Sequence, residues 1–185
     1  MTKAQLTVLA GPTAVGKGTV VAALTKRFPT LNVSISATTR APRPGELNGV
    51  HYYFVSTQEF DAMIERGDML EWALVHGKNK YGTPRGPVDE ALAAGKPVLL
   101  EIDLAGARQV RTTRPDAQFI FLAPPSWEEL ERRLIGRGTE SPEEQARRLA
   151  TARVELEAAS EFDHVVINDD VERAVDELAR LIGLE

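Results

Sequence analysis

A glycine-rich loop near the start of the chain limits the possible folds more than any other feature. Residues 11–19 read Gly-Pro-Thr-Ala-Val-Gly-Lys-Gly-Thr and follow an apolar run at 6–10 that predicts a buried strand. Apolar residues recur at helical spacing after the loop, at Val20, Val21, Leu24 and Phe28. A loop between a strand and a helix turns its N–H groups toward one anion, and the helix N-terminus adds partial positive charge. The sequence therefore predicts a phosphate-binding loop in an α/β protein.

The expected ligand of this loop is a nucleoside triphosphate, because Lys17 adds a full positive charge to the backbone donors. The residues predicted to contact it are Gly11, Pro12, Thr13, Ala14, Val15, Gly16, Lys17, Gly18 and Thr19. The hydroxyl residue that usually follows the lysine and touches magnesium is replaced here by Gly18, with Thr19 one place later. We therefore expect Thr19 to contact the metal partly through water.

Composition narrows the class of protein. A chain of 185 residues with 43% apolar content can bury one core, which favours a single domain with insertions. The absence of cysteine excludes disulfides, thiolate catalysis and zinc–cysteine sites. A net charge of −5 argues against a nucleic-acid binder. The N-terminus lacks the apolar core of a signal peptide, and no apolar run approaches a membrane span, so a cytoplasmic protein without a membrane partner is expected.

Short apolar runs alternate with helical patterns along most of the chain. Residues 97–103, 117–123 and 164–168 predict strands that are each followed by a helix, as a parallel sheet requires. Helix N-caps are expected at Ser126, Ser141 and Asp170. These segments predict the core of the protein.

The pattern changes between residues 32 and 83. Short polar-aromatic strands are predicted at 32–36, 51–55 and 69–75, and they indicate a separate small lobe. Within it, Arg40 and Arg43 lie in a proline-stiffened segment and suit a terminal phosphate, because guanidinium groups donate paired hydrogen bonds. The alternative is a solvated basic turn.

Two further sets of side chains are candidates for a binding site. Tyr52 and Tyr81 can add hydroxyl donors to the arginines. Glu101 and Asp103 are two residues apart at the end of an apolar strand, so their side chains share one face at the edge where parallel sheets bind ligands. The alternative for this acidic pair is that both carboxylates only accept hydrogen bonds from loop N–H groups.

The combined motifs closely resemble those of the guanylate kinase family over almost the whole chain. They comprise the loop at 11–19, Ser-Ala-Thr-Thr-Arg-Ala-Pro-Arg-Pro-Gly-Glu at 36–46, Leu-Glu-Trp-Ala at 70–73, Tyr-Gly-Thr-Pro at 81–84, Leu-Glu-Ile-Asp at 100–103, Gly-Arg-Gly-Thr-Glu-Ser at 136–141 and Ile-Asn-Asp-Asp at 167–170. The resemblance implies one domain, 1–185, with a P-loop NTP-hydrolase-like three-layer fold. It divides this domain into a core with a parallel sheet (1–31, 96–125 and 161–185), an inserted GMP-binding lobe (32–95) and a helical lid (126–160).

The resemblance also implies roles for individual residues. The GMP phosphate would be held by Arg40, Arg43, Tyr52 and Tyr81, and the guanine by Ser36, Glu71 and Thr83. Glu101 and Asp103 would lie near the GMP ribose and the phosphates, with Asp103 holding magnesium through water. The catalytic lid arginines would be Arg133, Arg137 and Arg148, and Asn168 would lie beside the adenine. The chemistry agrees at Glu71, because one carboxylate can accept the two adjacent donors of guanine, a pair that adenine lacks.

The expected activity is transfer of the terminal phosphoryl group of ATP to GMP or dGMP in purine metabolism, with Mg²⁺ as cofactor and ATP as co-substrate. One alternative is a catalytically inactive guanylate-kinase-like domain that binds proteins, which Lys17 and the three lid arginines argue against. Another is a kinase for AMP or CMP, which Glu71 with Thr83 opposes. The sequence leaves the oligomeric state open.

Overall fold

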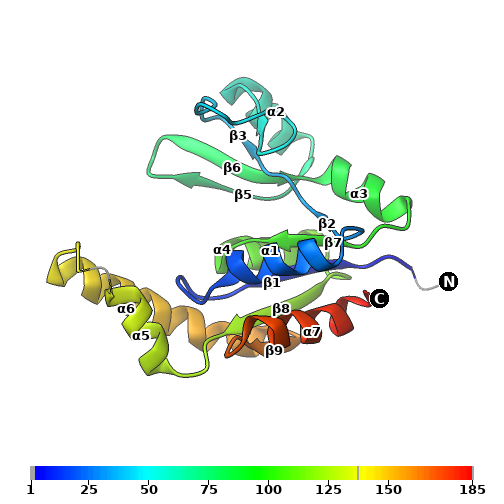
Figure 1. Cartoon of the computed structure of the whole chain (residues 1–185). Helices are drawn as coiled ribbons and strands as arrows, with labels where there is room; N and C mark the ends of the chain where they lie inside the picture. Colours follow the sequence, from blue (N-terminus) through cyan, green and yellow to red (C-terminus); the bar gives the residue numbers. More distant parts are fainter. Residues whose placement is uncertain (1–2, 137, 185) are drawn as a thin grey trace.

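The structure, a computed structural model, describes residues 3–136 and 138–184 (Figure 1). Its core is a five-stranded sheet in the order β2-β7-β1-β8-β9, and every neighbouring pair is parallel. The strands are β1 (Leu6–Ala10), β2 (Asn32–Val33), β7 (Val98–Glu101), β8 (Gln118–Ala123) and β9 (His164–Ile167). The carboxyl ends of these strands therefore meet at one edge of the sheet, where ligands bind in such folds.

Helices cover both faces of this sheet and make three layers. They are α1 (Lys17–Arg27), α3 (Arg85–Ala93), α4 (Leu104–Thr113) and α7 (Val171–Ile182). Neighbouring residues of β1 point to opposite faces, because Leu9 packs with residues of α1 and α7 while Val8 packs with residues of α3 and α4. The α/β prediction with a parallel core sheet is confirmed.

The boundaries predicted for the core are close to the observed ones. The runs at 97–103, 117–123 and 164–168 form β7, β8 and β9, which are one to three residues shorter than predicted. The three N-caps are also confirmed: Ser126 accepts from the Glu129 N–H, Ser141 from the Glu144 N–H and Asp170 from the Arg173 N–H.

A second sheet forms a small lobe, here residues 37–84, which lies above the core sheet in Figure 1. Its strand order is β4-β3-β6-β5, and it carries the helix α2. The elements are β3 (Ala37–Thr38), β4 (Tyr53–Phe54), α2 (Thr57–Glu65), β5 (Met69–Val75) and β6 (Asn79–Pro84). Ala37, Phe60 and Met69 form a separate buried cluster, so the small lobe has a core of its own.

The predicted strand at 32–36 is wrong in its placement. Its first two residues form β2, which pairs with β7 in the core sheet, and the Ser34 N–H donates to the Leu99 carbonyl before the chain leaves that sheet. The run at 51–55 shortens to the two residues of β4. At the other end of the insertion, α3 buries Val88 and Ala91 against the core. Strands of two residues are too short to produce a readable alternation of apolar and polar residues.

Two helices, α5 (Trp127–Ile135) and α6 (Pro142–Glu157), form a helical arm that extends from the core past the loop after β1 (Figure 1). They pack on each other through Leu130, Leu134 and Ala152. The chain returns from α6 to β9 through the short helix η1 (Ala158–Glu161). Across the described residues, no helix combines the length and apolar character needed to cross a membrane.

Candidate active site

The phosphate-binding loop joins β1 to α1 at the carboxyl edge of the core sheet. A side chain at Gly11 would place its Cβ 2.5 Å from the Leu122 carbonyl oxygen, so only glycine fits against β8. Ala14 and Gly16 have φ angles of 69° and 91°, and the Val15 N–H donates to the Pro12 carbonyl at 3.2 Å. The first turn of α1 begins directly at Lys17, which leaves the positive end of the helix at the loop.

Two side chains hold this loop from outside it, and both donate to the Val15 carbonyl. The Asn168 Nδ2 atom lies 2.8 Å from that oxygen and the Arg133 guanidinium lies 3.2 Å from it. Asn168 is only 5% exposed. Asn168 and Arg133 of the helical arm thus hold the backbone of the loop at the same carbonyl.

Lys17 lies among carboxylates. Its Nζ atom donates to the Ile102 carbonyl at 3.0 Å. Burial lowers the pKa of the Lys17 ammonium, while the negative charges of Glu101, Asp103 and Glu155 oppose that shift. An anionic ligand on the loop would therefore meet a lysine that is close by and only partly exposed to water.

Glu155 is a residue of this site that the sequence reasoning missed. It belongs to the last turn of α6, and burial raises the pKa of its carboxyl group, an effect that the Thr13 N–H and the Lys17 charge oppose. One carboxylate among the many charges of α6 carries no signal in the sequence. Its contact with the loop depends on how the helical arm returns to the core.

The acidic pair lies where the sequence placed it, at the end of β7: Glu101 is the last residue of that strand and Asp103 follows two residues later. The Glu101 carboxylate faces the phosphate-binding loop, 3.9 Å from the position that a Cβ on Gly18 would occupy. Asp103 caps α4, and its Oδ1 atom accepts from the Gly106 N–H at 2.7 Å. This hydrogen bond is of the kind expected under the alternative interpretation, in which the carboxylate only accepts from backbone N–H groups. It uses one of the two carboxylate oxygens of Asp103.

Glu71 and Thr83 meet across the β5–β6 pair of the small lobe. They are directly opposite in the strand register, and the Thr83 hydroxyl donates to Glu71 Oε1 at 2.8 Å. Burial raises the pKa of the Glu71 carboxyl group, and the hydrogen bond from Thr83 opposes that rise. Ser36 lies directly before β3 in the same lobe, where its carbonyl accepts from the Tyr53 N–H at 2.9 Å.

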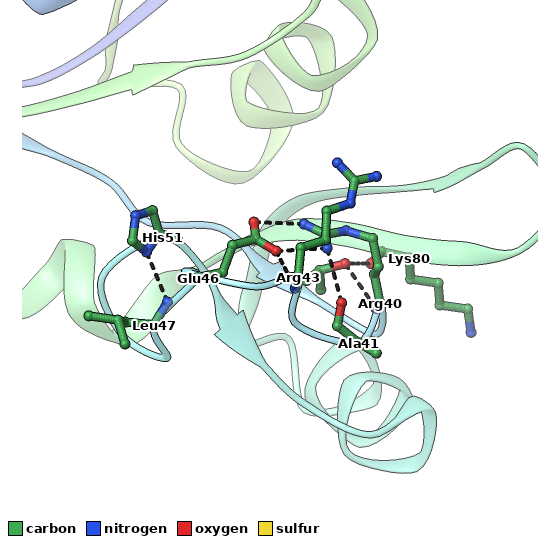
Figure 2. A network of polar contacts seen from close by, with 8 residues as sticks. Arg40, Ala41, Arg43, Glu46, Leu47, His51 and Lys80 are labelled. Carbon is green, nitrogen blue, oxygen red and sulfur yellow. Dashed lines mark hydrogen bonds and ion pairs between the residues drawn. The ribbon is translucent and has the colours of Figure 1, made fainter.

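Arg40 is held by Glu46, as Figure 2 shows. The two residues make a bidentate ion pair with distances of 2.9 and 3.0 Å, and Glu46 also accepts from the Arg43 N–H at 2.7 Å. These contacts lower the pKa of Glu46 to about 2. The Arg43 guanidinium points away from Glu46 in this view. The sequence reasoning gave Glu46 no role. The available signal was a carboxylate that directly follows a glycine and lies three and six residues after the two arginines.

The two tyrosines lie beside this arginine. The Arg40 guanidinium lies over the Tyr52 ring at 5.3 Å, and the Tyr52 and Tyr81 rings are in edge contact at 6.1 Å. The structure therefore brings together the four residues predicted to hold the GMP phosphate, which are Arg40, Arg43, Tyr52 and Tyr81. The two arginines of this group are called the arginine fork below. The group lies on the small lobe, apart from the phosphate-binding loop.

The remaining lid arginines differ from Arg133. Arg148 is paired with Glu140 at 2.6 Å, within the helical arm. Arg137 lies outside the described residues. Of the two predicted arginines that the structure describes, Arg133 is therefore the one that contacts the phosphate-binding loop.

Comparison with known proteins shows to which family this chain belongs. A family model described as guanylate kinase matches residues 3–185. A guanylate kinase of Nocardia farcinica is 60% identical over 97% of this chain and 93% of its own length, and one of Thermobifida fusca is 61% identical over 97% and 91%. The crystal structure of guanylate kinase from Anaplasma phagocytophilum, 31% identical, superposes with a TM-score of 0.72 over 99% of this chain and 86% of that one. The chain belongs to the guanylate kinase family.

Proposed function

We propose that this protein transfers the terminal phosphoryl group of ATP to GMP or dGMP, producing ADP and GDP or dGDP. The observation that carries the proposal is the Glu71–Thr83 pair on the same lobe as the arginine fork, across from the phosphate-binding loop. Two phosphate-binding elements on different parts of one molecule suit a donor and an acceptor nucleotide. The carboxylate on the acceptor side suits guanine.

The ATP phosphates would lie on residues 11–19. The bent backbone of this loop and the N-terminus of α1 favour a polyphosphate, and Lys17 would neutralise charge on the transferring group. Asn168 and Arg133 keep the loop in shape through the Val15 carbonyl. Asn168 would also lie beside the adenine of ATP, as the resemblance implies.

GMP would bind to the small lobe. Arg40 and Arg43, with the Tyr52 and Tyr81 hydroxyls, would hold its phosphate, because guanidinium groups match phosphate oxygens in pairs. The ring N–H and the 2-amino group of guanine would donate to the Glu71 carboxylate. The proposed GMP contacts are completed by Ser36, Thr83, Glu101 and Asp103.

Mg²⁺ fits the residues at the edge of the core sheet. No cluster of three or more His, Asp or Glu side chains suited to a metal occurs in the described part of the chain, so the protein would not hold the ion alone. This agrees with the preference of Mg²⁺ for phosphate and water ligands with one or two protein oxygens. Asp103, which has one oxygen outside its cap, and the Thr19 hydroxyl would hold it, partly through water. Bound there, it would supply charge neutralisation at the phosphates.

The transfer step needs no covalent intermediate. A phosphate oxygen of GMP attacks the terminal phosphorus of ATP in line and ADP leaves, while positive charges stabilise the transition state. We propose that the helical arm is the lid that supplies Arg133, Arg137 and Arg148 and keeps water from the phosphoryl group. A cytoplasmic location stays a prediction.

An ADP-release assay with GMP, dGMP, AMP, CMP and UMP as acceptors tests this function. We expect turnover with GMP and weaker turnover with dGMP. Comparable turnover with AMP would overturn the assignment of the base. Folded protein that turns over none of the five would instead favour a protein-binding domain without kinase activity.

A further inference from the structure

Gly106 is a buried residue of α4 whose own backbone gives no reason for glycine. It is the third residue of that helix, and it is absent from the residues with positive φ. Alanine has a higher helix propensity than glycine at such a position. The reason for glycine must therefore lie in what a side chain would contact.

A Cβ on Gly106 would touch two carboxylates of the proposed site. It would lie 3.1 Å from Glu71 Oε2 and 3.1 Å from Asp103 Oδ1, both closer than ordinary van der Waals contact. Asp103 Oδ1 is fixed by its hydrogen bond from the Gly106 N–H at 2.7 Å. Glu71 is held through its other oxygen, by the Thr83 hydroxyl at 2.8 Å. The group that can yield to a methyl is therefore the Oε2 end of Glu71.

We infer that Gly106 is a positioning residue for base recognition, because its missing side chain leaves the space in which the Glu71 carboxylate faces the guanine. This inference rests on the proposed function, since it concerns the same GMP site. The Thr83 hydroxyl on β6 fixes Glu71 Oε1. The surface of α4 at Gly106 determines how close Oε2 can come to that helix. The sheet of the small lobe and a helix of the core thus jointly set the orientation of one carboxylate.

Orientation matters because guanine offers two adjacent donors, the ring N–H and the 2-amino group. A carboxylate accepts both only when its two oxygens lie in the plane of the base. A displacement of a few tenths of an ångström at Oε2 weakens one of the two hydrogen bonds and leaves ATP binding on the loop unaffected. The base of IMP lacks the 2-amino group, so the ratio of kcat/KM for GMP to that for IMP reports on this geometry.

The test is Gly106→Ala, with Gly86→Ala as the matched control, because Gly86 is also helical and a Cβ there would meet nothing within 4 Å. For Gly106→Ala we expect KM for GMP to rise about tenfold, the equivalent of about 1.4 kcal/mol. The preference for GMP over IMP should shrink, and KM for ATP should stay constant. Gly86→Ala should behave as the wild type in all three measurements.

Each of the other possible results refutes one specific claim. Failure of the wild type to use GMP would refute the proposed function itself. With an active wild type, an unchanged KM for GMP in Gly106→Ala would refute the inference. A rise in KM for ATP equal to that for GMP would also refute it, because the methyl would then be acting through Asp103.

A second variant covers the case in which Gly106→Ala does not fold. In Gly106→Ala combined with Glu71→Ala, the methyl meets no Glu71 carboxylate. This double variant should fold, as Glu71→Ala alone should. If it also fails to fold, the role of Gly106 is to pack the helix, and the inference is wrong.

Discussion

Three carboxylates of the candidate site, those of Glu46, Glu71 and Asp103, have different neighbours. Glu46 is paired with Arg40 and accepts from the Arg43 N–H, contacts that lower its pKa to about 2. Glu71 is partly buried, and this burial raises its pKa although the Thr83 hydroxyl opposes the rise. Asp103 caps a helix. The sequence predicted that Glu71 and Asp103 belong to the site, but it did not predict that Thr83 lies directly opposite Glu71, because that contact depends on the register between β5 and β6.

Replacing Glu71 with glutamine tests base recognition. The amide keeps the size of the side chain but turns one acceptor oxygen into an NH₂ group that faces the donors of guanine. We expect KM for GMP to rise by about tenfold to a hundredfold, since a lost charged hydrogen bond costs roughly 1.5–3 kcal/mol. KM for ATP should stay the same. Steady-state kinetics with each substrate varied in turn measures both constants, and a rise shared by ATP would remove Glu71 from the guanine site.

The pH dependence of stability tests the Glu46 clamp. The folded pKa of about 2 is below the ordinary value of 4.5, so ionised Glu46 stabilises the folded protein above pH 4.5. That contribution is lost as the pH falls from 4.5 through 2. Thermal unfolding of Glu46→Gln should therefore depend less on pH in this window than that of the wild type. Identical pH dependence in the two proteins would show that the ion pair with Arg40 does not form in solution.

At the scale of elements, α5 of the helical arm contacts the phosphate-binding loop at the Val15 carbonyl. Arg133 donates to the Val15 carbonyl, whereas the side chain of its neighbour Arg132 is 75% exposed. Both arginines also pair with Glu129 on the same helix. The sequence predicted both helices of the arm through their caps. It did not predict which arginine touches the loop, because helical spacing alone does not give the angle between the arm and the core.

These two arginines make a matched pair for mutagenesis. Arg133→Ala should lower kcat by about tenfold to a hundredfold, because a positive charge near the transferring group acts mainly in the transition state. Its effect on KM for either substrate should be smaller. Arg132→Ala should leave kcat unchanged, since exposed ion pairs contribute little. Equal losses in the two variants would contradict the role proposed for the arm.

At the scale of the whole molecule, the candidate site is shared by three parts that fold around separate clusters of apolar residues. The core sheet carries the loop, the small lobe carries the arginine fork and Glu71, and the arm carries Arg133. The core strands were predictable because apolar runs of four to six residues leave a clear pattern. The two-residue strands β2, β3 and β4 leave none, so the start of the lobe was placed too early.

This division predicts that the two substrates respond separately to Lys17→Ala. Lys17 belongs to the phosphate-binding loop on the core. Its loss should lower turnover by about a hundredfold or more, because removing one donor that stabilises transition-state charge typically costs an enzyme that much. The Kd for GMP, measured by calorimetry, should stay within about twofold of the wild-type value because GMP is proposed to bind the small lobe. Loss of GMP affinity together with turnover would mean that Lys17 supports the fold of the site as a whole.

The most direct test of phosphoryl transfer follows the transferred group itself. ATP labelled on its terminal phosphate is incubated with GMP, Mg²⁺ and the protein, and the products are separated. We expect the label in the β-phosphate of GDP, at a rate that falls with Lys17→Ala. Label that appears only as inorganic phosphate, or that stays in ATP while the protein remains folded, would contradict transfer from ATP to GMP.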